Sequence, residues 1–448
     1  MIHISRRAFI ASSAFTLMTP LEGLRGRLRS GRSIHADGYG PLRPARDATT
    51  GWPLLELPEG FRYLTLGWTG DPLTDGGVTP PAHDGMAAFA GSDGLVTLVR
   101  NHEISPGPAF GPRPYDAQGG GGTVTVIFDP AAERAVSMRP SLTGTLRNCA
   151  GGPTPRGSWL TCEETVLGPS DNPLLEEQHG YVFEVPSAGG AEPVPITDMG
   201  CFVHEATATD PATGVVYETE DQGSAGLYRF IPKTPDRLQA GGTLQMLAVD
   251  GRPRYVTRER QRVGQRLGIH WVDIPEPNRP HSPGAKDARG VHTQGLAAGG
   301  AIFSRLEGAW FGDGRLYVTA TSGGDARMGQ VWEIDPKADT LRLVFESPGP
   351  DVLNMPDNIC VSPRGGLVLC EDNSTRAFVH GLTRDGRIFR FARNNMLLPE
   401  RRNGFSGDFT TSEFAGATFS PDGRWLFVNG QRPGVTFAIT GPWDGGGL

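Results

Sequence analysis

Acidic residues stand at the ends of short, strand-like segments along the chain, and their recurrence is the first sign of chemistry. The clearest segment, 214–221, follows a glycine turn, alternates in polarity and ends in Glu-Thr-Glu-Asp. The acids at comparable places are Glu103, Glu163, Glu164, Glu205, Glu218, Glu220, Asp221, Glu307, Glu371 and Asp372. Carboxylates gathered at one place repel one another unless cations offset their charge, and calcium prefers oxygen donors of this kind. The pattern predicts a site for multivalent cations, with Asn101, Asn358 and Asn373 as further donors.

Two residues of other types lie among these acids. Cys149 takes the place that an acid holds in the other segments, and a thiolate among carboxylates indicates a transition metal, because calcium does not seek sulfur. A buried, inert thiol is the alternative interpretation of this cysteine. Arg305 lies two residues before Glu307 and therefore on the same face of a strand. A guanidinium beside bound cations suits a tetrahedral oxyanion such as phosphate.

Other sequence signals exclude several classes of enzyme. The sequence contains no HExxH, GxSxG or Walker A motif, so it lacks the signatures of zinc peptidases, serine hydrolases and P-loop NTPases. Its five cysteines form no CxxC pair, so in an exported protein at least one thiol stays unpaired or binds a metal. Cys162 and Cys370 fall within strand-like runs and are expected in the core.

A repeated unit must position these residues. Strand-like segments after a glycine turn recur at 94–103, 157–164, 214–221, 314–321, 366–373 and 423–430. Each is followed by a further alternating segment, at 123–129, 181–185, 227–231, 330–335, 387–391 and 435–439. Each is preceded by a short polar run, at 83–84, 148–149, 204–205, 306–307, 356–358 and 413–415. Six antiparallel units predict an all-β, six-bladed β-propeller whose inner strand ends bring the acids to one channel mouth.

Two stretches stand outside this repeat. Residues 233–297 are basic and are predicted to be an insertion between blades three and four, either a solvated excursion or a lid that supplies cations. The start of the chain has a twin-arginine pattern, Arg6-Arg7, followed by a modest apolar run. We interpret residues 1–36 as an export signal and linker, and residues 37–448 as the propeller.

The charge of the chain limits its partners. Residues 1–36 hold six arginines and one glutamate, so their removal takes the formal charge from −7 to −12. So acidic a protein is a poor candidate for nucleic-acid binding. We expect a periplasmic or secreted monomer with no membrane attachment after signal cleavage.

Several stretches together resemble the PhoX family of secreted bacterial alkaline phosphatases. The matching stretches are 146–164, 179–186, 202–221, 305–310, 356–373 and 414–434, and they follow the family's order. The resemblance implies a six-bladed propeller whose channel mouth holds two ferric ions and three calcium ions around a bridging oxo group. It also implies hydrolysis of small phosphomonoesters outside the cytoplasm. The chain is short for the family, which leaves the substrate preference open.

The resemblance also implies roles for individual residues. Cys149, Glu205 and Glu307 fall on the family's iron ligands, and Arg305 falls on its phosphate-binding arginine. The calcium ligands would come from the other acids, namely Glu103, Glu163 or Glu164, Glu218, Glu220, Asp221, Glu371 and Asp372. In this interpretation the metals neutralise the phosphoryl oxygens while Arg305 clamps one of them.

Two other functions remain open from the sequence. One is a calcium-dependent lactonase or esterase of the gluconolactonase-like propeller class, whose strands also contain the pattern PDNIxVSPxGGL. Such sites use a single calcium and do not need Cys149. The other is a propeller that binds calcium for rigidity, has no catalytic activity and recognises a partner. Iron content separates the phosphatase from both.

Overall fold

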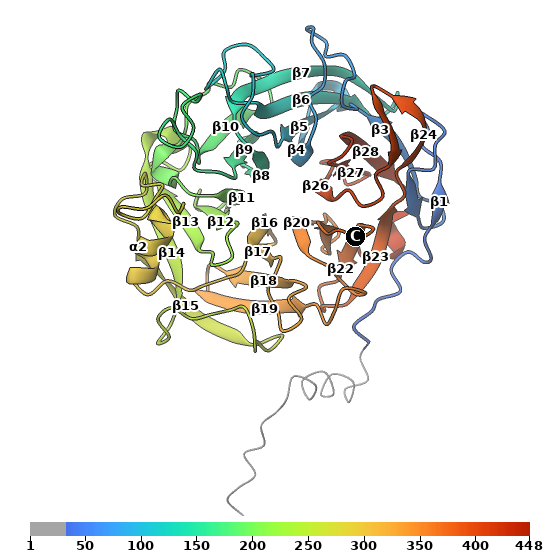
Figure 1. The fold of residues 1–448 in the computed structure, drawn as a ribbon. Helices are drawn as coiled ribbons and strands as arrows, with labels where there is room; N and C mark the ends of the chain where they lie inside the picture. Colours follow the sequence, from blue (N-terminus) through green and yellow to red (C-terminus); the bar gives the residue numbers. More distant parts are fainter. Residues whose placement is uncertain (1–32) are drawn as a thin grey trace, which may run out of the picture. The chain divides into compact units, whose positions relative to one another are not determined.

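Short antiparallel strands joined by glycine turns make up almost all of the regular structure. The computed structural model describes residues 33–448, so the twin-arginine motif lies outside the described residues. Residues His35–Leu448 form one compact unit. Within the described part of the chain, α2 (Gly290–Ala297) is the α-helix, and no helix there is long and apolar enough to span a membrane. The arrangement is all-β and propeller-like (Figure 1).

The strands form six sheets. One has four strands: β4 (His83–Ala90), β5 (Val96–His102), β6 (Gly121–Asp129) and β7 (Arg134–Thr145). The next has three: β8 (Asn148–Pro153), β9 (Ser158–Glu163) and β10 (Val182–Pro186). A nine-stranded sheet runs in the spatial order β11 (His204–Thr209), β12 (Val216–Glu220), β13 (Leu227–Pro232), β14 (Gly242–Val249), β15 (Arg266–Asp273), β19 (Thr340–Glu346), β18 (Gln330–Asp335), β17 (Arg315–Ala320) and β16 (Leu306–Gly312).

The remaining sheets combine both ends of the chain. A six-stranded sheet has the order β20 (Pro356–Val361), β21 (Leu367–Glu371), β22 (Phe378–Leu382), β23 (Ile388–Asn394), β2 (Leu55–Leu57) and β1 (Arg43–Ala45). A four-stranded sheet has the order β26 (Phe414–Phe419), β27 (Trp425–Gly430), β28 (Val435–Thr440) and β3 (Arg62–Leu66). A separate hairpin pairs β24 (Leu397–Arg402) with β25 (Phe405–Asp408).

A closed ring of inner strands organises these sheets. β4 contacts β8, and the contacts continue through β11, β16, β20 and β26 back to β4. Figure 1 shows these six strands around the centre, with later strands of each unit farther out. Glycines allow the close approach: at Gly416, whose φ is 62°, a side chain would collide with the backbone of Asp84 on the neighbouring inner strand. Each of the six strand-like segments predicted after a glycine turn contains the second strand of a unit, so the predicted places of these six strands are confirmed.

Two predictions about strands need correction. The segment 387–391 is the start of β23, the fourth strand of its unit, and the third strand is β22, which the sequence analysis missed. β22 is short, and its glycine, Gly381, accommodates the ring of Phe389 from the next strand. Residues 233–297 contain β14 and β15, which continue the sheet outward from β13, as well as α2.

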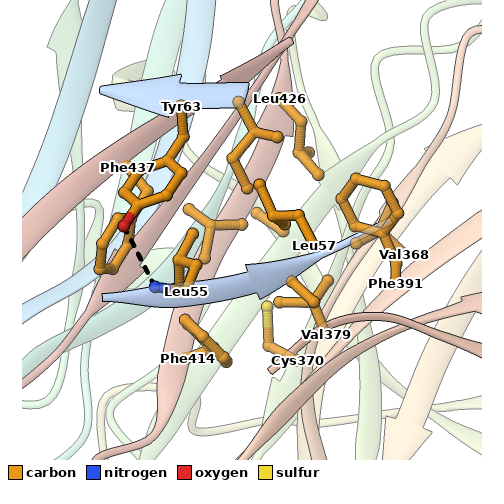
Figure 2. Packing of buried hydrophobic residues seen from close by; sticks show 14 of the residues in the cluster. Leu55, Leu57, Tyr63, Val368, Cys370, Val379, Phe391, Phe414, Leu426 and Phe437 are labelled. Carbon is orange, nitrogen blue, oxygen red and sulfur yellow. Dashed lines mark hydrogen bonds between the residues drawn. The ribbon is translucent and has the colours of Figure 1, made fainter. Parts of the chain in front are cut away.

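The N-terminal strands complete the ring and its core. β3 pairs with β28 and β2 pairs with β23, so residues from the start of the chain close the last two units. Between these units lies an apolar cluster in which Tyr63 is fully buried. Its hydroxyl accepts hydrogen bonds from the backbone N–H groups of Leu54, at 2.8 Å, and of Leu55, at 3.2 Å, and Figure 2 shows the bond from Leu55. Cys370 packs in the same cluster, which confirms it as a core thiol.

Candidate metal centre at the mouth of the ring

Every inner strand begins with an irregularity that turns one side chain toward the ring. The pairing with the second strand shifts register near the start of each inner strand, as in β4, where His83 pairs with His102 and Met86 with Arg100. Such bulges redirect side chains and are common beside active sites. The second residues of the six strands are Asp84, Cys149, Glu205, Glu307, Asp357 and Ala415. Four carboxylates and one thiol therefore hold equivalent places.

Polar side chains from neighbouring second strands hold the bulges in place. The amide of Asn101 donates hydrogen bonds to the carbonyls of Cys149 and Ala150, at 3.1 and 2.8 Å. The hydroxyl of Thr219 donates to the carbonyl of Glu307, and that of Thr319 to the carbonyl of Asp357, both at 2.6 Å. These groups are buried, so the bonds satisfy carbonyls that the bulges remove from the sheet. Asn101 supports the fold here and does not face the mouth as a cation donor.

We call the four carboxylates at the second positions of the inner strands, Asp84, Glu205, Glu307 and Asp357, the inner acids. Three of them converge. Ligand atoms of Glu205, Glu307 and Asp357 lie within 4.8 Å of one another, and all three residues are buried. Burial, followed by the charges of the neighbouring acids, raises the pKa of Glu205 and Glu307 well above the ordinary value. Burial and Asp372 raise the pKa of Asp357 to about 7. Buried like charges at this spacing favour either protonation or a bound cation.

A second tier of acids follows the second strands. The members that face the mouth are Glu103, Glu164, Asp221 and Asp372, which we call the rim acids. Their backbone N–H groups all bond to the residue two positions before an inner acid or Cys149; for example, Glu103 donates to the carbonyl of Ala82 at 2.9 Å and Glu164 to that of Arg147 at 3.0 Å. Burial raises the pKa of Glu164 to about 9. The rim acids thus surround the inner acids at fixed places.

Asp84, Glu103 and Glu413 form a further cluster whose ligand atoms also lie within 4.8 Å of one another. Gln431 joins two of them, since its amide donates to Glu103 at 2.9 Å and to Asp84 at 3.3 Å. Burial is the main cause that raises the pKa of Asp84 and of Glu413. This cluster is a second place where the described residues can hold a cation.

Two arginines occupy equivalent positions between the tiers. Arg305 lies two residues before Glu307 and Arg147 two residues before Cys149, with φ of 48° and 47°. Arg305 donates to both oxygens of Asp221, at 2.9 and 3.2 Å, and to Glu307 at 2.5 Å. Arg147 pairs with Glu103 at 3.4 Å and with Glu164 at 2.6 Å. Both guanidinium groups are partly exposed, so they can contact a molecule that enters the mouth.

The charges at the mouth do not balance. Nine carboxylates (Asp84, Glu103, Glu164, Glu205, Asp221, Glu307, Asp357, Asp372 and Glu413) interact with one another there, and two arginines accompany them. The formal charge of this set is −7 when every carboxyl is ionised. Multivalent cations would offset that charge, and carboxylates are the ligands that hard cations prefer.

Four acids proposed from the sequence point away from this mouth. Glu163 accepts hydrogen bonds from three backbone N–H groups and from His179 within its own unit. Glu371 likewise bonds to two backbone N–H groups and to His380. Glu220 bonds to the N–H of Gly226 and the hydroxyl of Tyr228, and Glu218 pairs with His204 at 3.0 Å. The structure therefore does not bring these four carboxylates together with the inner acids.

Cys149 lies beside Glu205. Its thiol approaches the carbonyls of His204 and Glu205, both at 3.4 Å, and burial together with the charge of Glu205 raises its pKa well above the ordinary value. All five cysteines are buried and free. Cys149 differs from the other four because it holds the ring position that acids occupy elsewhere.

Sequence reasoning missed Asp84, Asp357, Glu413 and Arg147. Asp84, Asp357 and Glu413 lie in short polar runs that were noted as the starts of repeat units, and Arg147 directly precedes such a run, yet none was selected as a site residue. The available signal was position: Asp84 and Asp357 stand where Glu205 and Glu307 stand in their own units. Asn358 and Asn373, expected as cation donors, bond instead to neighbouring protein groups, Asn358 accepting from the N–H of Gly416 at 2.6 Å.

Small and mainly apolar residues line the inner strands just after the inner acids. The void there has a volume of about 10 Å³ and is lined by residues such as Ala150, Ala206, Gly308 and Trp310. A space of that size holds one water molecule at most.

Comparisons with known proteins bear on the family and the fold of this chain. The profile of the family described as alkaline phosphatase PhoX matches residues 37–127 and 121–434. Comparison with curated proteins gives no match. Among solved structures, Pseudomonas fluorescens PhoX in complex with vanadate, a transition state analogue, has a TM-score of 0.65 at 18% identity and covers 92% of this chain and 99% of its own. A Xanthomonas campestris gluconolactonase has a TM-score of 0.46 at 14% identity, and the match covers 90% of this chain and 98% of the gluconolactonase.

The structural likeness shows the shared fold, and the family profile extends over most of the chain. The matched residues include all the inner and rim acids, Cys149 and both arginines of the mouth. The chain therefore belongs to the PhoX family of alkaline phosphatases, which are hydrolases of phosphoric monoesters.

Proposed function

We propose that this protein is an exported phosphomonoesterase that uses an iron and calcium cluster at the mouth of the ring. The observation that carries the proposal is the convergence of Glu205, Glu307 and Asp357 within 4.8 Å, with Arg305 bonded to one of them. Membership of a metal-dependent phosphatase family supports the same chemistry.

The residues present fit such a cluster. Buried carboxylates with raised pKa, held against one another, form a set of donors that a highly charged cation would stabilise. We assign the two ferric ions to Cys149, Glu205, Glu307 and Asp357. We assign the three calcium ions to the rim acids together with Asp84 and Glu413. We assign no metal to Glu163, Glu218, Glu220 or Glu371, whose carboxylates bond within their own units.

When bound, the ions would supply Lewis-acid charge that neutralises the phosphoryl oxygens and favours attack at phosphorus. The protein supplies position. Asp221 and Glu307 hold the guanidinium of Arg305 from two sides, so its free edge is oriented before a substrate arrives. A planar guanidinium can then donate to phosphoryl oxygens, and more strongly as their charge grows.

We also propose the finer architecture. Dividing the nine-stranded sheet between β15 and β19 gives six blades, each starting at one inner strand. Loops of 233–297 then form an insertion between the third and fourth blades, around β14. Residues 1–36 act as the twin-arginine signal and linker, and 37–448 as the catalytic domain. The mature protein is proposed to be a periplasmic or secreted monomer with small phosphomonoester substrates and neither a nucleic-acid nor a membrane partner.

The test is hydrolysis of an aryl phosphate by protein exported through its own signal. Turnover is measured with calcium, after chelation and after calcium is restored, and iron is quantified on the same sample. We expect calcium-dependent turnover with close to two irons per chain. Turnover that survives chelation, or active protein without iron, would contradict the proposed cluster.

A further inference from the structure

A basic segment of the 250–265 loop reaches the mouth. Val256 bridges to Ile302, and the N–H of Thr257 donates to the carbonyl of Ile302 at 2.9 Å. The N–H of Gly324 donates to the carbonyl of Arg258 at 2.6 Å, and the N–H of Arg260 donates to Asp325 at 2.7 Å. These bonds fix the segment between the loops that follow the second strands β12 and β17.

Arg258 is positioned by this segment but lacks a charged partner. Its Nη2 donates to the carbonyl of Gly223 at 2.6 Å. Its Nε is shielded from solvent and has no acceptor. No carboxylate of the described residues lies within ion-pair distance of it, whereas Arg147 and Arg305 each contact two. Arg258 as a whole is only half-buried, so the other N–H groups of its guanidinium can meet an anion that enters from solvent.

Arg258 and Arg305 are tied to the same short loop. The backbone N–H of Arg305 donates to the carbonyl of Gln222 at 2.9 Å, and its side chain bonds to Asp221. Arg258 bonds to the next carbonyl, that of Gly223. Only Gln222 lies between Asp221 and Gly223, so their Cα atoms lie within about 7 Å of each other. The two guanidinium groups therefore flank one stretch of the mouth.

We propose that Arg258 forms a second anion subsite, which selects phosphomonoesters that carry a further carboxylate or phosphate a few bonds from the reacting phosphoryl group. This inference rests on the proposed function, because Arg305 holds the reacting group. The basic loop thus contributes to specificity from outside the inner and rim acids. Arg258 contacts the distal anion and takes no part in the phosphoryl transfer.

The test compares two ligands of equal length that cannot be hydrolysed, because carbon replaces the ester oxygen. One is 3-phosphonopropionate, which has a second charge, and the other is propylphosphonate, which has none. Dissociation constants are measured by calorimetry on the metal-loaded protein, for wild type, Arg258→Gln and the matched control Arg260→Gln. Arg260 lies two residues away, is exposed, and only its backbone N–H is bonded.

We expect Arg258→Gln to raise the dissociation constant of 3-phosphonopropionate about tenfold, which equals about 1.4 kcal/mol. The dissociation constant of propylphosphonate should stay unchanged. Arg260→Gln should alter neither constant. Equal weakening of both ligands would mean that Arg258 only supports the 221–224 loop, and it would overturn the inference. If neither dissociation constant changes while the turnover of aryl phosphate is intact, the inference about Arg258 is overturned and the proposed function stands. Absence of aryl phosphate turnover in the wild type would overturn the proposed function, and this inference with it.

Discussion

Replacing Asp357 by asparagine should stabilise the metal-free protein while impairing its metal binding. Asp357 is buried beside Glu205 and Glu307, with ligand atoms within 4.8 Å. At an effective dielectric constant of about 20, two unit charges at that distance repel by about 3.5 kcal/mol, which is the cost of each neighbour when it is ionised. Asparagine keeps the shape of the side chain and removes the charge.

The raised pKa of Asp357 gives a second estimate of the gain in stability, and it also shows how that gain changes with pH. Burial raises the pKa of Asp357 to about 7 in the folded protein. The unfolded value is about 4, and three pKa units correspond to about 4 kcal/mol. Because the folded state binds the proton more tightly, the stability of wild type falls as the pH rises from about 4 to about 7. The advantage of Asp357→Asn should therefore be small at pH 4 and complete above pH 8.

The assay is thermal unfolding of chelated protein between pH 4 and pH 8. For a unit of this length the entropy of unfolding is about 0.9 kcal/mol/K, so 4 kcal/mol corresponds to a rise in Tm of about 4–5 °C. Iron should narrow this difference, because a ligand at 100 times its Kd that binds wild type and not the variant stabilises wild type by about 2.7 kcal/mol. A lower Tm for the variant at pH 8, or a difference that does not vary with pH, would refute the reasoning.

Glu163→Gln is the matched control for this experiment. Glu163 is also fully buried, but its carboxylate accepts hydrogen bonds from Leu146, Gly180 and Tyr181 and from His179. Loss of the charge weakens these bonds, and the amide NH2 of glutamine, itself a donor, would face backbone N–H donors with which it cannot bond. We expect this change to lower the stability of the metal-free protein by about 2–4 kcal/mol. The two neutralised acids should thus shift Tm in opposite directions.

Three further changes test other parts of the structure. Arg305→Ala should raise KM and lower kcat together and leave metal content unchanged, and an unchanged kcat/KM in steady-state kinetics would exclude a clamp. Cys149→Ser should lower the iron content measured by elemental analysis, whereas the core change Cys162→Ser should not; equal iron in both would remove Cys149 from the ligands. Tyr63→Phe should cost about 1–3 kcal/mol in denaturant unfolding, because two buried N–H groups that bond to the hydroxyl lose their acceptor.

Much of the fold could be read from local pattern. The six second strands are marked by alternating residues after glycine turns, and this signal is local because side chains of a strand alternate between faces. Six repeats of such an antiparallel unit then predicted a closed ring of blades. By contrast, β3 joins the last unit across the whole length of the chain, pairing with β28. A pairing between such distant segments has no local sign, since neither segment is unusual by itself.

The sequence predicted which types of residue form the candidate site better than it predicted which individual residues belong to it. Paired acids such as Glu163-Glu164 and Glu220-Asp221 end the second strands, and alternation turns the first acid into its own unit and the second toward the mouth. The same alternation was available in the sequence, but the choice of face depends on where the ring lies. Asp357 could not be identified as a site residue without knowing where the ring lies, because a short polar run is equally typical of an ordinary turn.

The sequence alone determined which chemistry the protein can hold: acids and one cysteine at repeated places, with an arginine two residues before Glu307. Only the tertiary structure decided which of them meet. Bulges at the start of the inner strands aim Glu205, Glu307 and Asp357 at one point, and ring closure brings their strands together. The cause is geometric, because distances between residues of different sheets depend on how the sheets pack and not on spacing along the chain.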